Sequence, residues 1–125
     1  MLAAVRPATD TLAARIILGL PGNPVSVMVT AWRLGIEMIG ALAGLSTQHF
    51  AAHTRAVTNA DKATLPMWWY RLVGERVNAS GHSELHLLSG KGSGDIATAA
   101  SSVGFIEVAP GEQTLGAHNF YAWMH

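Results

Sequence analysis

The chain has 125 residues, half of them hydrophobic, with eight acidic and eight basic side chains and no cysteine. This length fits one domain, or part of a domain followed by a small one, and a formal net charge of zero excludes a bulk field that would draw the chain to nucleic acid or to an acidic membrane. The lack of cysteine excludes a disulfide framework and a thiolate metal site. The N-terminus shows no charged segment followed by an apolar one, as a signal peptide would, so we expect a cytoplasmic protein.

The first part of the chain predicts a strand, a tight turn and the start of a helix. Residues 1–11 are weakly patterned and are expected to be extended or loose, whereas residues 12–20 contain a short apolar run that predicts a buried strand. In the turn that follows, Gly22 suits a positive φ, Asn23 suits the N-cap, and Pro24 suits the first helical position.

Residues 25–45 are long and apolar enough to raise the question of a membrane span. Arg33 and Glu37 lie near the middle of this segment, where each charge would be costly in lipid. With Ser26 and Thr30 they follow a spacing of four, three and four residues, which places them in one polar stripe along a helix. We therefore expect the helix of a folded domain, buried on most of its circumference.

The hydrophobic period changes from helical to alternating near residues 45–48, which predicts a domain boundary between residues 1–45 and residues 46–125. The second part predicts strands, hairpin turns and a short helical turn that Asp95 caps. The expected strands are residues 50–59, 67–77, 84–88, 105–108 and 117–124. The fold class is therefore α+β, with a small antiparallel β domain, of clip or barrel type, at the end.

Two glycine-containing segments are the candidate binding sites. In the first, free amides and the helix dipole meet at a helix start, which favours a bound anion, and Ser26 adds a hydroxyl donor. In the second, successive amides can form an anion nest beside a lysine. Each segment is also consistent with a purely structural turn. Their sequences are Gly19-Leu20-Pro21-Gly22-Asn23-Pro24-Val25-Ser26 and Gly90-Lys91-Gly92-Ser93-Gly94.

These segments resemble motifs of the molybdopterin molybdotransferase family, the MoeA/gephyrin family. Residues 19–26 resemble its GLPGNPVS signature, residues 89–98 are similar to its GxGSG loop, and residues 104–108 are similar to the strand that follows. The resemblance covers nearly the whole chain, but only the C-terminal third of a typical member. It implies that residues 1–45 end an α/β molybdopterin-binding domain and that residues 46–125 form the closing β domain.

The resemblance implies a role in molybdenum cofactor biosynthesis. In that family, molybdate is inserted into the dithiolene of adenylylated molybdopterin and AMP is released, with a divalent cation such as Mg²⁺. The resemblance places the turn of the first segment beside the substrate and Ser93 of the second near the oxyanion. The substrate-binding and oxyanion-binding candidates are Pro21, Gly22, Asn23, Pro24, Ser26, Lys91, Gly92, Ser93, Gly94, Arg71 and Arg6.

The chain departs from the family pattern at two places. Arg6 keeps the first cation of a cation-Pro-Gly-Lys-Pro segment, but Ala8 and Thr9 stand at the next glycine and lysine positions. Arg71 matches the arginine that ends an aromatic-rich strand, whereas an upstream arginine of the motif is replaced near Pro66. Arg71 either faces the site or lies along Trp69.

The family's acidic residues for the metal and for hydrolysis lie upstream of the matching segment, so no catalytic residue and no metal ligand is assigned here. The pairs His49/His53 and His82/His86 fall on strand or turn patterns, where this spacing does not suit a metal. We expect a poor catalyst on its own that acts as a homodimer or with a longer homologue, and neither nucleic acid nor membrane as a partner. The alternatives are a non-catalytic scaffold or partner-binding module from the same family, and a small anion-binding protein.

Overall fold

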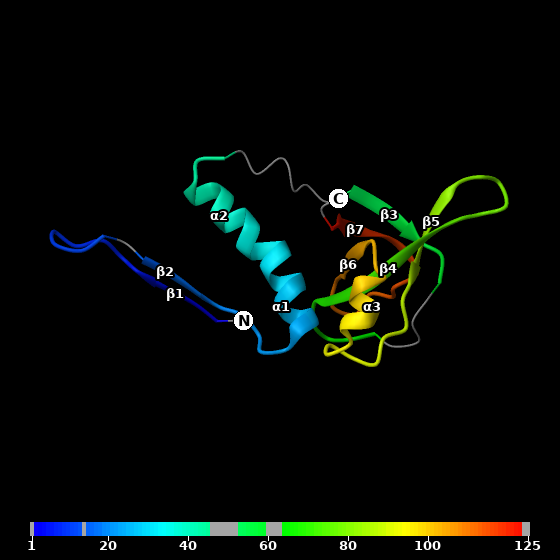
Figure 1. Ribbon diagram of the computed structural model, residues 1–125, viewed down its shortest axis with the longest axis horizontal. Helices are drawn as coiled ribbons and strands as arrows, with labels where there is room; N and C mark the ends of the chain where they lie inside the picture. The colour runs from blue at the N-terminus through cyan, green and yellow to red at the C-terminus, as the bar shows by residue number, and fades with distance from the viewer. Residues whose placement is uncertain (1, 14, 46–52, 60–63, 124–125) are drawn as a thin grey trace.

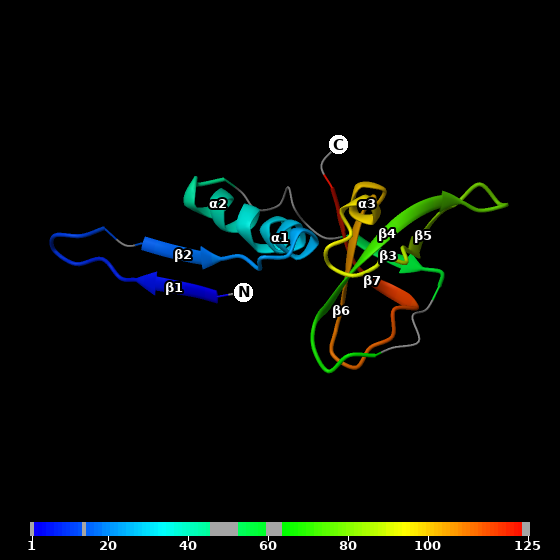
Figure 2. The same ribbon diagram turned by 60° about the horizontal axis from the view of Figure 1, so that its bottom comes forward.

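The computed structural model describes residues 2–13, 15–45, 53–59 and 64–123, which form an extended arm and a closed barrel (Figure 1). The arm consists of a two-stranded hairpin followed by one long helix. Its elements are β1 (Leu2–Arg6), β2 (Arg15–Gly19), α1 (Pro24–Thr30), a π-helical segment η1 (Ala31–Gly35) and α2 (Ile36–Leu42). Figure 2 shows the hairpin pointing away from the barrel, while the helix connects the two.

The hairpin agrees with one expectation from the sequence and corrects another. Residues 1–11, which were expected to be extended or loose, include the extended strand β1, which pairs antiparallel with β2 from Leu2 opposite Gly19 to Arg6 opposite Arg15. The strand predicted within residues 12–20 is present but not buried, since Ile17 is 65% exposed. A hairpin covered by one helix cannot bury both faces of its strands, and the helix approaches it where Leu18 lies next to Gly35.

The helix begins as predicted, with Asn23 at the N-cap and Pro24 at the first position. The side chain of Asn23, however, makes no capping hydrogen bond. Gly22 is not among the glycines with positive φ, so the backbone conformation expected at Gly22 was wrong. By length and composition alone, Pro24–Leu42 is the one described helix long and apolar enough to cross a membrane. It is less buried than predicted, because Ile39 and Leu42 are largely exposed.

Five strands close the barrel in the order β3-β5-β4-β6-β7. Their bounds are β3 His53–Val57, β4 Trp69–Val77, β5 Ser83–Leu87, β6 Gly104–Val108 and β7 Gly116–Ala122. Four neighbouring pairs are antiparallel, but β3 and β5 run parallel, with Val57 opposite Leu85. The all-antiparallel prediction is therefore wrong at one pair. A closed ring of five strands cannot alternate direction throughout, so at least one pair must be parallel.

The strand predictions otherwise match the described residues within a few positions. The predicted strand at residues 50–59 is observed at His53–Val57, and its residues 50–52 lie outside the described ranges, as does His49. The predicted helical turn is α3 (Ile96–Ala100), in which the Asp95 side chain accepts a hydrogen bond from the Thr98 amide, as expected of a cap.

Two apolar clusters hold these parts together. The barrel core contains Val73, Leu85 and Ile106, which are fully buried. In the second cluster, Val29 of the helix packs with the stacked rings of Phe105 and Tyr121, whose centroids are 5.1 Å apart. Apolar burial thus fixes the first two turns of the helix against β6 and β7.

We predict that Gly104→Ala destabilises the barrel. A β-carbon at Gly104 would overlap the Tyr121 carbonyl oxygen and lie 2.8 Å from the Phe120 ring and 2.9 Å from the Ala122 Cα. Overpacking of this kind costs about 1–3 kcal/mol. Gly40→Ala is the matched control, because its β-carbon meets nothing within 4 Å and alanine is favoured over glycine inside a helix by about 0.5–1 kcal/mol. Chemical denaturation compares the two, and equal free energies of unfolding would contradict the prediction.

Candidate functional site

The two predicted glycine segments meet within one chain. The Val25 amide, in the first turn of α1, donates a hydrogen bond of 3.0 Å to the Ser93 carbonyl in the glycine-rich loop. A cavity of about 670 Å³ lies beside this contact, between α1, the start of β4 and the loop. The helix start and the loop therefore form neighbouring walls of one site.

Four of the predicted site residues line this cavity, namely Ser26, Arg71, Gly92 and Ser93. Thr30 and Thr98 add further hydroxyl groups to the wall. Because Ser26 and Thr30 belong to the helical polar stripe, the stripe faces the cavity and the barrel. The other predicted residues do not line the cavity. Pro21, Gly22, Asn23 and Pro24 precede the wall, and Lys91 and Gly94 lie within the loop.

Arg6 lies apart from the cavity, on the hairpin. Its guanidinium donates a hydrogen bond of 2.8 Å to the Ala13 carbonyl, which closes the hairpin at the ends of β1 and β2. Of the two arginines predicted to bind the substrate, Arg71 therefore lines the cavity and Arg6 does not.

Arg71 meets both descriptions left open by the sequence. Its guanidinium carbon lies 4.3 Å from the centroid of the Trp69 ring, and the same side chain lines the cavity. Among the described lining residues it is the one charged side chain, and no carboxylate is among them. The cavity therefore favours an anionic ligand.

The glycine-rich loop is organised by an internal carboxylate. Asp95 accepts hydrogen bonds of 3.0 Å from the Lys91 amide, 3.0 Å from the Thr98 amide and 2.8 Å from the Thr98 hydroxyl. The bonds from Lys91 and then Thr98 lower the pKa of Asp95 to about 2. The stabilisation of the loop is thus complete above the ordinary pKa of 3.8 and is lost as pH falls through about 2. The Lys91 amide of the predicted nest already donates to Asp95 and is not available to a ligand. Side-chain donors are therefore needed to bind an anion here.

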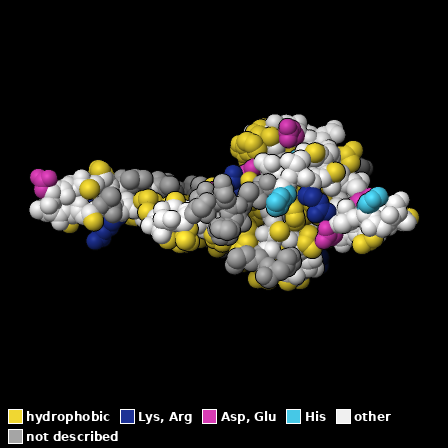
Figure 3. Space-filling model, turned by 90° about the horizontal axis from the view of Figure 1, so that it is seen from above, with side chains coloured by type: hydrophobic (Ala, Val, Ile, Leu, Met, Phe, Trp, Pro, Cys, Tyr) yellow, Lys and Arg dark blue, Asp and Glu magenta, His cyan; other side chains and the backbone are white. Residues whose placement is uncertain are grey.

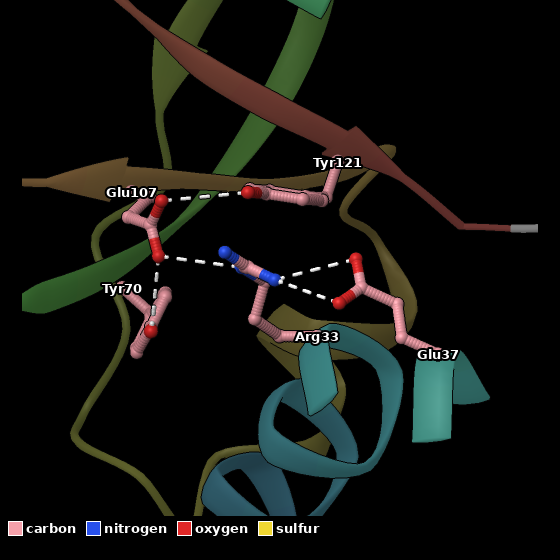
Figure 4. A network of polar contacts seen from close by, with 5 residues as sticks. All are labelled: Arg33, Glu37, Tyr70, Glu107 and Tyr121. Carbon is pink, nitrogen blue, oxygen red and sulfur yellow. Dashed lines mark hydrogen bonds and ion pairs between the residues drawn. The ribbon is translucent and has the colours of Figure 1, made fainter. Parts of the chain in front are cut away.

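A polar network that sequence reasoning missed connects the helix to the cavity wall (Figure 4). Arg33, in η1, lies 3.2 Å from Glu37 and 3.3 Å from Glu107 of β6, whose side chain is only 10% exposed. The hydroxyls of Tyr70 and Tyr121 donate to the same Glu107 carboxylate, at 3.1 and 3.4 Å. Since Tyr70 also lines the cavity, the network fixes the wall relative to the helix.

One sequence signal pointed toward this network. The polar stripe that contains Ser26 and Thr30 continues to Arg33 and Glu37, and a stripe whose first members face a cavity directs its later members to the same side. The partner Glu107 lies 74 residues from Arg33, beyond any local pattern.

Among the described residues, no group of three or more His, Asp or Glu side chains could hold a metal ion. A comparison with protein-family models found no match for the chain, and a comparison with curated proteins found none either. The family resemblance therefore stays a prediction that rests on the two motifs.

We predict that Glu107→Gln makes Tyr70 titrate at lower pH. Burial and then the Glu107 charge raise the pKa of Tyr70 to about 12 and also raise the pKa of Tyr121. Removing the charge shifts Tyr70 toward the ordinary tyrosine pKa of about 10. The chain has two tyrosines, so ultraviolet absorbance of phenolate reports only these, and Tyr70→Phe assigns the signals.

The same shift implies a loss of stability in alkali. Because the folded-state pKa of Tyr70 is raised, its contribution to stability is complete below about pH 10 and is lost as pH rises through about 12. Circular dichroism recorded in parallel separates titration of the folded chain from unfolding. Superimposable titrations of wild type and Glu107→Gln would contradict the role given to Glu107.

Proposed function

We propose that this chain supplies the oxyanion-binding part of a site that inserts molybdate into adenylylated molybdopterin with release of AMP. The observation that carries the proposal is the hydrogen bond from the Val25 amide to the Ser93 carbonyl. It brings the two motif segments that resemble the molybdotransferase family to one cavity, although they are distant in the sequence.

The lining groups suit the binding of molybdate and phosphate. Arg71 offers a guanidinium, which pairs well with tetrahedral oxyanions, and Ser26 and Ser93 offer hydroxyl donors. Their contribution is to position the reactants and to neutralise the negative charge that otherwise repels them. In this proposal residues 1–45 are the end of an α/β molybdopterin-binding domain and residues 46–125 close the site.

The proposal also specifies what must come from elsewhere. No carboxylate is among the described lining residues, and the described chain offers no acidic or histidine cluster for Mg²⁺. The acids for hydrolysis and the Mg²⁺ ligands therefore belong to another segment, on a second copy or on a longer homologue.

We predict that a Ser26→Ala/Ser93→Ala double variant and Arg71→Gln each weaken the binding of molybdate by at least about tenfold. A hydrogen bond to a charged group contributes about 1.5–3 kcal/mol, and tenfold corresponds to about 1.4 kcal/mol. Titration calorimetry with molybdate, phosphate and sulfate measures this effect, and Ser80→Ala, on an exposed turn, is the control. Unchanged affinities in both variants would contradict the site.

The catalytic assay is molybdate-dependent release of AMP from adenylylated molybdopterin. We expect the purified chain to bind the pterin but to release no AMP above the Ser26→Ala/Ser93→Ala background, since the acids are missing. Release by wild type above that background would overturn the view that the site is incomplete. Equal binding of molybdate, phosphate and sulfate would favour a general anion-binding protein.

One observation favours the alternative of a partner-binding module. Hydrophobic side chains remain exposed along the arm (Figure 3), with Ile16 and Ile17 on the hairpin and Ile39 and Leu42 on the helix. If these side chains form a contiguous patch, they mark a protein interface. A second copy of the chain or a longer homologue is the partner that both hypotheses share.

We predict that the chain self-associates and that Ile17→Lys/Ile39→Lys abolishes the association. In an interface, a lysine at either of these exposed positions would lose its hydration without gaining an opposite charge, which would oppose association. Sedimentation velocity compares the observed mass with the 13.2 kDa of one chain. Val77→Lys is the control, because Val77 is equally exposed but lies on the barrel. A monomeric wild type would contradict the prediction.

A further inference from the structure

The cavity is much larger than an inorganic oxyanion. Its volume of about 670 Å³ lies within the range of about 300–1,000 Å³ found for sites that hold drug-sized ligands. A molybdate or phosphate ion, with five heavy atoms, would fill only a small part of it. The rest of the cavity has room for a larger body attached to the anionic group.

Three consecutive aromatic side chains line that wall, and two of them are already engaged. Trp69 carries the Arg71 guanidinium over its ring. Tyr70 is held by Glu107 and contacts Phe105 edge to face, with the ring centroids 5.8 Å apart. Trp68 differs, because it is 58% exposed and has no ring partner among the described residues. An indole face is thus available at the edge of the cavity.

Trp68 and Arg71 lie close together in the sequence and line the same cavity. A cavity lined by one exposed aromatic face and one cation, with no carboxylate among its described lining residues, is complementary to a flat ring that bears a negative group. Stacking on an exposed aromatic side chain depends little on the identity of a ring, whereas the charged end demands an anion.

We propose that Trp68 is the stacking platform for a planar heteroaromatic ring whose attached phosphate is bound by Arg71, Ser26 and Ser93. The ligand class rests on the proposed function, and the new element is the assignment of its ring to Trp68. Trp68 would then be a specificity-determining residue, which selects ligands that carry a ring over free inorganic oxyanions.

The test uses AMP, which has ring and phosphate, ribose 5-phosphate, which lacks the ring, and adenosine, which lacks the phosphate. We expect wild type to bind AMP more tightly than either of the other two. Trp68→Leu should weaken AMP binding by about tenfold, toward the affinity for ribose 5-phosphate, since stacking of one base contributes on the order of tenfold or more. Binding of ribose 5-phosphate itself should not change.

Two further variants make the test specific. Trp68→Phe retains an aromatic face and should restore most of the AMP affinity, whereas Ser80→Ala, on an exposed turn away from the cavity, should leave it unchanged. AMP should also quench the indole fluorescence of wild type and of Ser80→Ala more than that of Trp68→Leu. Thermal unfolding of Trp68→Leu close to that of wild type shows that the fold is intact.

The outcomes separate this proposal from the proposed function. If Trp68→Leu binds AMP as wild type does while Arg71→Gln loses it, the stacking role is overturned and the anion site stands. If wild type binds neither AMP nor ribose 5-phosphate, the anion site fails and the stacking proposal fails with it.

Discussion

The ion pair between Arg33 and Glu107 is the interaction on which the arrangement of the site depends. Apolar packing of Val29 against Phe105 and Tyr121 holds the helix on the barrel, but hydrophobic contact is non-directional and would tolerate rotation of the helix. Arg33 lies on Tyr121, 5.0 Å from the ring centroid, and pairs with Glu107. The free energy needed to desolvate these partly buried charges offsets much of their attraction. The ion pair therefore fixes the orientation of the helix on the barrel more than it adds to stability.

Arg33 belongs to a π-helical segment. A π turn contains one residue more than an α turn, and such segments are frequent at functional sites. Arg33 lies within Ala31–Gly35, between two stretches of regular α-helix. The helix presents its first turns to the cavity, while Ile39 and Leu42 remain on the surface.

Local structure at helix ends was predictable from the sequence, whereas contacts and strand pairs between distant residues were not. Pro24 at the helix start and Asp95 as a cap are decided by neighbours within a few residues, and both were predicted correctly. The burial of residues 12–20 was overestimated because an apolar run looks the same whether a second sheet face is covered or not. The parallel pair of β3 and β5 follows from closure with five strands, which no single strand encodes. In the candidate site, the two sequence motifs predicted Ser26 and Ser93 but did not indicate a role for Glu107.

The hairpin and the cavity are joined by a short stretch of chain, which bears on how the site could be completed. The strand β2 ends at Gly19, and the helix that lines the cavity begins at Pro24. Both outer edges of a two-stranded hairpin present unpaired backbone groups, so a further strand paired there would be held within a few residues of the cavity entrance. In the proposed function, a polypeptide that paired there would bring the missing acidic side chains toward Arg71.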